Sequence, residues 1–92
     1  MYNILPYSYK QASKLKVIIK PSSKKNKKID VYDLNNNFLV SIGSINHLDY
    51  PYYIKYKGKD YANKRRELYK KRFQKTRLIK NTASYFADKI LW

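Results

Sequence analysis

The stretch KLKVIIKPSSKKNKKIDVYDLNNNFLVSIG, residues 14–43, decides the fold of this chain. Its first segment, residues 14–20, alternates apolar and polar side chains, so that Leu15, Val17 and Ile19 lie on one face and lysines mostly on the other. This period of two is typical of a strand with one buried face. The polar residues that follow should end the strand and form a basic loop.

Two further strands follow within the same stretch. The second is expected over residues 28–33, with Ile29 and Val31 on one face, and the third over residues 38–43. Between them the chain reads Leu-Asn-Asn-Asn, and asparagine tolerates the left-handed backbone angles that a tight turn needs. We therefore expect a three-stranded antiparallel meander.

Beyond the third strand the apolar spacing becomes helical. Asp49 can cap a short helix that begins near Pro51, a residue suited to the first turn, and Gly58 can stop it. A second helix is expected from about residue 60 to about residue 75. On that helix, lysines should line one flank beside an apolar arc.

The last segment carries the clearest buried stripe. Asn81 or Thr82 can cap a helix over residues 83–91, and Trp92 is predicted to pack beside it. Its apolar residues recur at the spacing i, i+3, i+4, i+7 and i+8. These residues are Ala83, Phe86, Ala87, Ile90 and Leu91.

Together these segments predict an α+β fold, with a three-stranded antiparallel β-meander followed by two to three α-helices packed on it. A chain of 92 residues can bury one modest core. We therefore expect residues 14–92 to form a single α+β domain. Residues 1–13 are expected to be an extended N-terminal arm.

The charge is large and unevenly placed. Twenty-one Lys and Arg residues oppose six Asp and Glu residues, which gives a net charge of +15. Residues 29–54 contain no Lys or Arg, whereas residues 55–80 contain twelve. Self-repulsion disfavours a compact state at this charge, so a polyanionic partner is the economical explanation. The alternative is a structural protein with a lysine-rich exterior.

The basic loop and the second helix supply the expected phosphate-binding residues. Lysine ammonium groups contact phosphate without reading base sequence. The alternative for each is a solvated surface position. The candidates are Lys24, Lys25, Lys27, Lys28, Lys64, Arg66, Lys70, Lys71, Lys75 and Arg77.

Two arginines of the second helix differ from these lysines because they fall within its apolar arc. Arg65 and Arg72 would then have buried stems and heads that need a specific partner. One interpretation is a structural ion pair, and the other is contact with phosphate or with a partner's carboxylate. The available carboxylates are Asp30, Asp33, Asp49 and Asp88.

Aromatic residues near these charges suggest base stacking. Tyr50, Tyr52, Tyr53 and Tyr56 are clustered enough to form a stacking platform. Their helical spacing favours a place in the core instead. His47, the single histidine, is expected to form a hydrogen bond rather than to act in catalysis.

The composition excludes most catalytic sites. The chain has no cysteine, and its two glycines cannot build a phosphate-cradling loop. The acids are too few and too scattered for a metal site, so we expect no enzyme, no metal and no cofactor. No apolar run approaches the ~18 residues of a membrane span, and no signal-peptide pattern begins the chain. We therefore expect no membrane partner and no secretion.

Several short motifs together suggest an origin. They are Val31-Tyr32-Asp33, Ser41-Ile42-Gly43, Asp49-Tyr50-Pro51, residues 58–62, the Arg-rich residues 65–72, and Ala87-Asp88-Lys89-Ile90-Leu91-Trp92. Over about residues 14–92 the chain is similar to a family of small, basic proteins of unassigned activity encoded by large (giant) double-stranded DNA viruses. The resemblance implies a viral origin and transfers no functional residue.

These observations lead to one principal hypothesis about function. The expected partner is nucleic acid, DNA rather than RNA, bound largely through phosphate contacts. The protein would then work in the virion or inside the infected cell, in cytoplasm or nucleus. One alternative is a minor structural virion protein that cements the capsid or core, and another is an adaptor for a viral or host enzyme.

Overall fold

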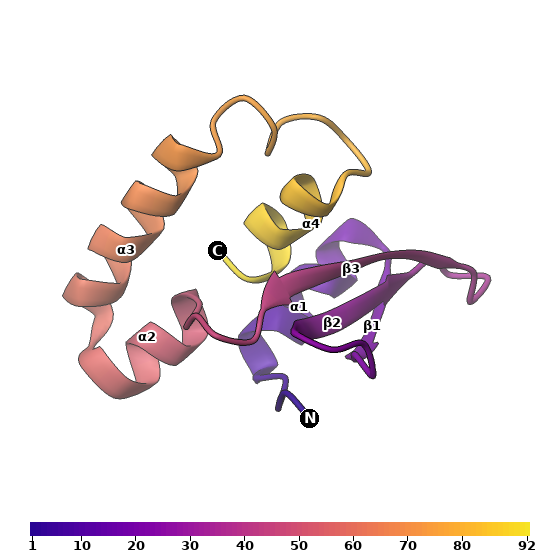
Figure 1. Cartoon of the computed structure of the whole chain (residues 1–92), viewed down its shortest axis with the longest axis horizontal. Helices are drawn as coiled ribbons and strands as arrows, with labels where there is room; N and C mark the ends of the chain where they lie inside the picture. The colour runs from indigo at the N-terminus through magenta and orange to yellow at the C-terminus, as the bar shows by residue number, and fades with distance from the viewer.

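The computed structural model describes residues 1–92. Along the chain, one helix precedes the sheet and three follow it (Figure 1). The expected α+β class and the antiparallel meander are both confirmed. The sequence did not predict the first of its four helices. The elements are α1 (Pro6–Leu15), β1 (Ile18–Pro21), β2 (Lys27–Tyr32), β3 (Phe38–Ser44), α2 (Tyr50–Lys57), α3 (Lys59–Arg72) and α4 (Ala83–Ile90).

The sheet has the order β1-β2-β3, with both pairs antiparallel. The expected turn between β2 and β3 is present, and Asn36 has a left-handed φ of 67° there. The carboxylate of Asp33 accepts the backbone N–H groups of Asn35 and Asn37 at 2.9 Å each. These hydrogen bonds hold the pKa of Asp33 below its usual range, and the bond from the backbone of Asn37 has the largest effect.

The N-terminal segment is a helix and not an extended arm. Pro6 stands in the first turn of α1, where its fixed φ suits a helix. The small residues Ser8 and Ala12 are buried, and the Ser8 hydroxyl donates to the backbone carbonyl of Ile90 at 3.0 Å. This docking on α4 stabilises α1 although little in its own sequence requires a helix.

The extent of α1 also corrects the first strand. Lys14 and Leu15 belong to the last turn of the helix, which Lys16 closes with a left-handed φ of 58°. The first strand therefore begins at Ile18 and not at residue 14. A short alternating segment fits a helix end as well as a strand, and packing decided between them.

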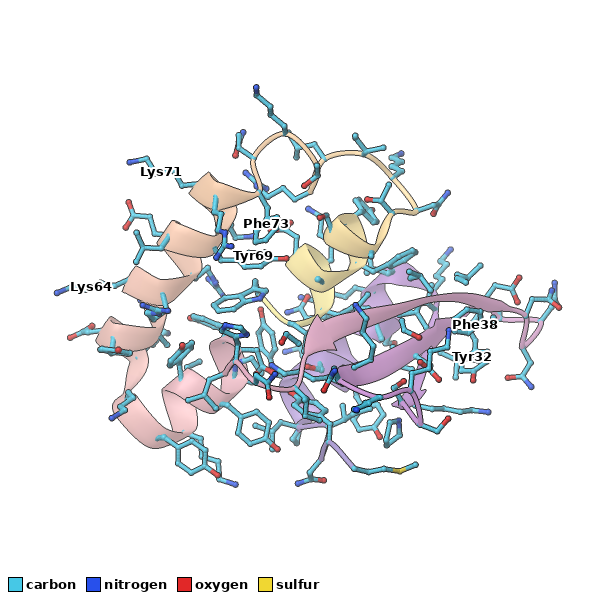
Figure 2. All side chains as sticks on the ribbon, viewed as in Figure 1. Tyr32, Phe38, Lys64, Tyr69, Lys71 and Phe73 are labelled. Atoms are coloured by element: carbon cyan, nitrogen blue, oxygen red, sulfur yellow. The ribbon has the colours of Figure 1, made fainter.

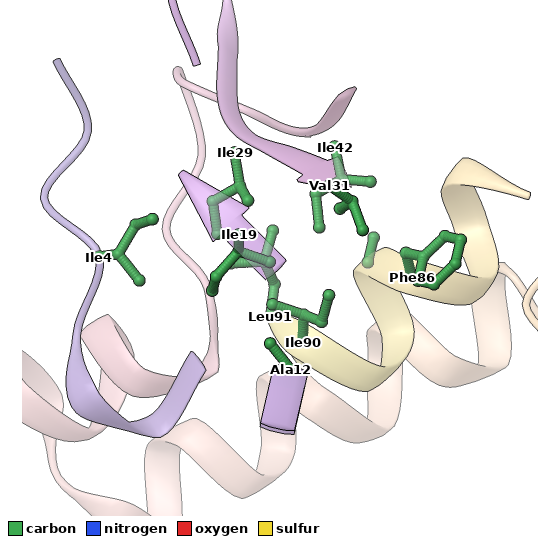
Figure 3. Close-up of a cluster of buried hydrophobic side chains, with 10 residues drawn as sticks. Ile4, Ala12, Ile19, Ile29, Val31, Ile42, Phe86, Ile90 and Leu91 are labelled. Carbon is green, nitrogen blue, oxygen red and sulfur yellow. The ribbon is translucent and has the colours of Figure 1, made fainter. Parts of the chain in front are cut away.

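The core lies between the sheet and two helices that meet across it. One face of the sheet contributes isoleucine and valine side chains, and α4 contributes Phe86 and Ile90, which are almost fully buried (Figure 3). Helices α1 and α4 thus cover the sheet. The core residues are Ile4, Ala12, Ile19, Ile29, Val31, Ile42, Phe86, Ala87, Ile90 and Leu91.

Helices α2 and α3 pack against each other and extend away from the sheet (Figure 1). The predicted caps are confirmed: Asp49 accepts the N–H of Tyr52 at 3.3 Å, and Gly58 ends α2 with a φ of 89°. The end of α3 differs from expectation, because the helix stops at Arg72 and not near residue 75. The expectation that the helices after the sheet pack on it thus holds for α4 alone.

Helix α4 follows the sequence closely. Thr82 is its cap and accepts the N–H of Tyr85 at 3.2 Å. Four of the five residues of the predicted stripe are buried, whereas Ala83, in the first turn, is exposed. Trp92 packs as expected, with its ring stacked on that of Tyr69 at 4.5 Å.

Candidate nucleic-acid interface

One of the predicted phosphate-binding lysines, Lys28, lies inside the protein. Lys28 is 4% exposed, and its ammonium lies 2.9 Å from the Oδ2 atom of Asp49, which is also buried. The hydroxyl of Tyr2 donates to the same oxygen at 2.6 Å. Burial and this hydrogen bond to a carboxylate raise the pKa of Tyr2. Lys28 is therefore a structural residue, and its prediction as a phosphate contact is wrong.

A second buried acid takes two more of the predicted phosphate contacts. Asp88 is 1% exposed, and it lies 2.7 Å from the ammonium of Lys70 and 3.6 Å from the guanidinium of Arg77. Arg77 also donates to Gln74 at 2.7 Å. Lys70 and Arg77 thus join the end of α3 and the following turns to α4. A phosphate would have to compete with Asp88 for both cations, so their role in binding stays a prediction.

Arg66 is also a structural residue. Its guanidinium lies 3.4 Å from the centre of the Tyr50 ring and donates to the hydroxyl of Tyr7 at 3.2 Å. Arg66 therefore connects α3 to α1 and α2, and it is only partly exposed. The guanidinium is engaged inside this junction, and phosphate contact by Arg66 stays a prediction.

Arg65 and Arg72, unlike the cations above, are not engaged by other groups in the interior. Both are exposed, and neither forms an ion pair with a carboxylate. The Arg65 guanidinium lies 5.4 Å from the centre of the Tyr53 ring, and that of Arg72 lies 5.4 Å from the centre of the Phe73 ring. Of the two interpretations, the structural ion pair is not formed, because Arg65 and Arg72 border an open groove that no acid lines.

This groove lies between α3, β3 and α4, and its volume is about 470 Å³. Tyr69 and Phe73 point from α3 toward α4 (Figure 2), and with Tyr53 and Trp92 they give the groove four aromatic rings. No Asp or Glu lines it. The only charged side chains along it are Lys27, Lys28, Arg65 and Arg72, with His47 nearby on the loop after β3.

Gly43 shapes one wall of the groove. Its φ is +83°, a conformation that side-chain-bearing residues rarely adopt. A Cβ there would lie 2.9 Å from the Cδ1 atom of Leu91 and 2.9 Å from the Cδ atom of Lys28. The absence of a side chain therefore lets β3 lie directly against Leu91 and against the aliphatic stem of Lys28.

The outer face of α3 presents a different arrangement. Lys64 and Lys71 point away from the molecule (Figure 2). Asp60 and Glu67 each precede one of these lysines by four residues, so acids and lysines alternate along the same face. Lys75, expected within the same helix, is exposed but follows the end of α3. The outer face is therefore nearly neutral.

The loop before β2 supplies the remaining predicted contacts. Lys24, Lys25 and Lys27 are exposed. The ammonium of Lys24 lies 4.3 Å from the centre of the Phe38 ring, which is itself exposed. Phe38 packs edge-on against Tyr32 at 5.8 Å, which forms an aromatic patch that sequence reasoning missed. The pairing register of β2 with β3 is interrupted by a β-bulge beside Tyr32, and a sequence pattern does not reveal such a bulge.

The tyrosines of α2 divide between two roles. Tyr50 is buried, as expected for the core, and its hydroxyl donates to Asn63 at 2.8 Å. Tyr56 is 60% exposed and stacks on Tyr52, so these two do not belong to the core. Tyr53 is partly exposed and lines the groove. The Nδ1 atom of His47 lies 3.1 Å from the hydroxyl of Ser44, the hydrogen-bonding role expected for this residue.

The chain contains no helix with the length and apolar character that crossing a bilayer requires. No protein-family model, curated protein or solved structure matches it. The resemblance to a family of giant-virus proteins therefore stays a prediction.

Proposed function

We propose that this protein is not an enzyme and that it binds nucleic acid, largely through phosphate contacts. The observation that carries this proposal is the division of charge between interior and surface. Two of the six acids, Asp49 and Asp88, pair with lysines and arginines in or near the core. Among the predicted contacts, the exposed cations that form no ion pair are Lys24, Lys25, Lys27, Lys64, Arg65, Lys71, Arg72 and Lys75.

Aromatic side chains beside these cations favour nucleic acid over other polyanions. Lys24 lies over Phe38, Arg65 lies over Tyr53 and Arg72 lies over Phe73. Proteins that bind single strands combine basic grooves with aromatic rings on which bases stack. A sulfated polysaccharide offers the charge without the planar bases. DNA remains the preferred partner because of the resemblance to DNA-virus proteins.

Fluorescence anisotropy with labelled single-stranded and duplex DNA of equal length tests the proposal. Binding should be micromolar or tighter at low salt, and it should weaken steeply as salt is added. A heparin competitor of matched charge should displace duplex DNA but compete less well against the single strand. Absence of binding to every nucleic acid at low salt would contradict the proposal.

A structural role in the virion is supported by a second observation. Several large apolar side chains are exposed outside the groove, among them Leu34 at 63%, Leu78 at 58% and Ile79 at 55%. Such residues can dock on a larger subunit of a capsid or core. Co-sedimentation with nuclease-treated empty shells would favour this role. Release of the protein by nuclease would favour nucleic-acid binding.

A further inference from the structure

We infer that the groove between α3, β3 and α4 binds an unpaired nucleotide of a single-stranded nucleic acid, with its base against the aromatic rings and its flanking phosphates on Arg65 and Arg72. The inference rests on the proposed function and assigns it a site. It also predicts a preference for single strands, which the surface lysines alone would not produce.

The size and lining of the groove suit a base. Its volume of about 470 Å³ falls within the range of about 300–1,000 Å³ typical of small-ligand sites. Tyr53, Tyr69, Phe73 and Trp92 all line it, and Trp92 and Phe73 each pack on Tyr69. Every base has a π-face that can stack on such rings. A base in a duplex is covered by its neighbours and cannot enter without being flipped out.

The charge around the groove suits the backbone of the same nucleotide. Arg65 and Arg72 are exposed, form no ion pair, and lie along a wall without acids. They are seven positions apart in the helix, which places them about 10 Å apart along its axis. They can therefore contact phosphates on either side of a bound base. The planar guanidinium matches phosphate with two parallel hydrogen bonds.

An acidic peptide with an apolar anchor is the rival occupant of such a groove. The number and arrangement of aromatic rings favour the nucleotide. The Tyr69 and Trp92 rings are already stacked face to face and parallel to within 8°, and a planar base can extend such a stack. Arg65 and Arg72 each lie over a ring as well, and an arginine plane is a second surface on which bases stack. A leucine or isoleucine anchor would use neither feature.

Trp92 is the only tryptophan and reports directly from the groove. The first experiment therefore follows its fluorescence during titration with three DNA ligands of one length: an oligothymidylate, an abasic strand with the same number of phosphates, and a duplex. We expect the oligothymidylate to quench Trp92 strongly. The abasic strand and the duplex should bind with little quenching, and the abasic strand should bind at least about five-fold more weakly.

Helix α3 supplies a matched pair of variants. Arg65→Gln with Arg72→Gln removes two charges from the groove, and Lys64→Gln with Lys71→Gln removes two charges from the outer face. We expect the arginine variant to lose single-strand affinity about ten-fold or more and to lose the preference over duplex. The lysine variant should bind both ligands slightly more weakly, with the quenching intact. Melting curves on both variants check that each is folded.

The outcomes separate this inference from the proposed function. If the two double variants weaken binding equally and the oligothymidylate leaves Trp92 emission unchanged, the groove is not the site, although the protein still binds nucleic acid. If a Glu- and Leu-containing peptide quenches Trp92 and the oligothymidylate does not, the groove is a peptide site and the inference is wrong. If no nucleic acid binds at low salt, both proposals fall together.

Discussion

Lys27 and Lys28 are adjacent in the sequence and have opposite environments. Lys27 is exposed beside the groove, whereas Lys28 is buried and paired with Asp49. Replacing Lys28 with Met would leave the Asp49 carboxylate buried without its counter-charge. We expect a loss of about 3–5 kcal/mol in the free energy of unfolding. Urea denaturation measures this loss directly.

The control for that experiment is the neighbouring residue. Lys27→Met removes the same charge from an exposed position, so its free energy of unfolding should change by no more than about 0.5 kcal/mol. Its effect should appear in nucleic-acid binding instead. Equal loss of stability in the two variants would show that the pair with Asp49 contributes nothing specific.

The hydroxyl of Tyr69 makes the free energy of unfolding depend on pH in the alkaline range. Burial, followed by the nearby charge of Asp88, raises the pKa of its hydroxyl to about 12. An unfolded tyrosine titrates near about pH 10. Between these values the unfolded chain has released a proton that the native protein still holds, so deprotonation favours unfolding. This contribution is complete below about pH 10 and is lost as the pH rises toward about 12.

We therefore expect the urea midpoint to fall between about pH 10 and pH 12. Burial also raises the pKa values of Tyr2, Tyr7 and Tyr52, so the wild-type curve alone does not identify the group. Tyr69→Phe removes only this hydroxyl and should flatten the decline. Identical pH profiles for the two proteins would contradict the assignment to Tyr69.

Sequence reasoning located the charged residues well but did not pair them correctly. It left Arg65 and Arg72 open between a structural ion pair and phosphate contact and placed Lys28 on the surface. The structure exposes both arginines without an ion pair and buries Lys28 against Asp49. The residue-by-residue pattern cannot reveal this arrangement. Which cation meets an acid depends on where Asp49 and Asp88 lie in space, and that depends on the packing of whole helices.

Helix α4 has only eight residues, and three of them belong to the hydrophobic core. Phe86 and Ile90 are 3% and 0% exposed and pack between the sheet and α1. Changing either to Ala would leave a cavity that neighbouring side chains fill only in part. We expect each substitution to lower the free energy of unfolding by about 2–5 kcal/mol. Chemical denaturation checks this.

Leu78→Ala is the matched control for those substitutions. It removes an apolar side chain of similar size from the turns before α4, where Leu78 is 58% exposed. The change in the free energy of unfolding should stay within about 0.5 kcal/mol. A comparable loss at Leu78 would mean that these turns form part of the stable structure and are not a surface loop.

Elements with strong local signals were predictable from the sequence. The second and third strands, the Asn-rich turn, and the caps at Asp49, Gly58 and Thr82 all rest on interactions within a few residues. Helix α1 was not predictable in the same way. Its small buried residues Ser8 and Ala12 signal a helix only once α4 is in place against them.

The whole surface determines how binding responds to salt. If the exposed lysines and arginines engage about four to seven phosphates, log affinity for duplex DNA should fall against log salt with a slope of about −3.5 to −6. Binding should be largely independent of sequence, because ammonium groups do not read base edges. An anisotropy series from low to high salt measures the slope. Micromolar binding that hardly changes across this series would show that phosphate contacts are not the main source of affinity.

At the scale of the molecule, the fold class followed from the sequence, whereas the groove did not. The groove exists because α3 packs on α2 and leaves its inner face uncovered, while α4 and not α3 covers the sheet. Both helices carry aromatic residues on their apolar sides, so either could have covered the sheet. The hydrophobic pattern indicates which face is apolar but not which surface it meets.

The dependence of the core on α4 also has a consequence during synthesis. Ile90 accepts a hydrogen bond from Ser8, Leu91 accepts one from the N–H of Tyr50, and both side chains fill the space between the sheet and α1. As long as α4 is still inside the ribosomal tunnel, the sheet lacks the helix that covers its apolar face. The nascent chain must therefore remain incompletely folded, with its apolar face open to chaperones, until this helix emerges. A nascent chain stalled with α4 inside the tunnel should therefore be cut faster by protease than one stalled with α4 outside it.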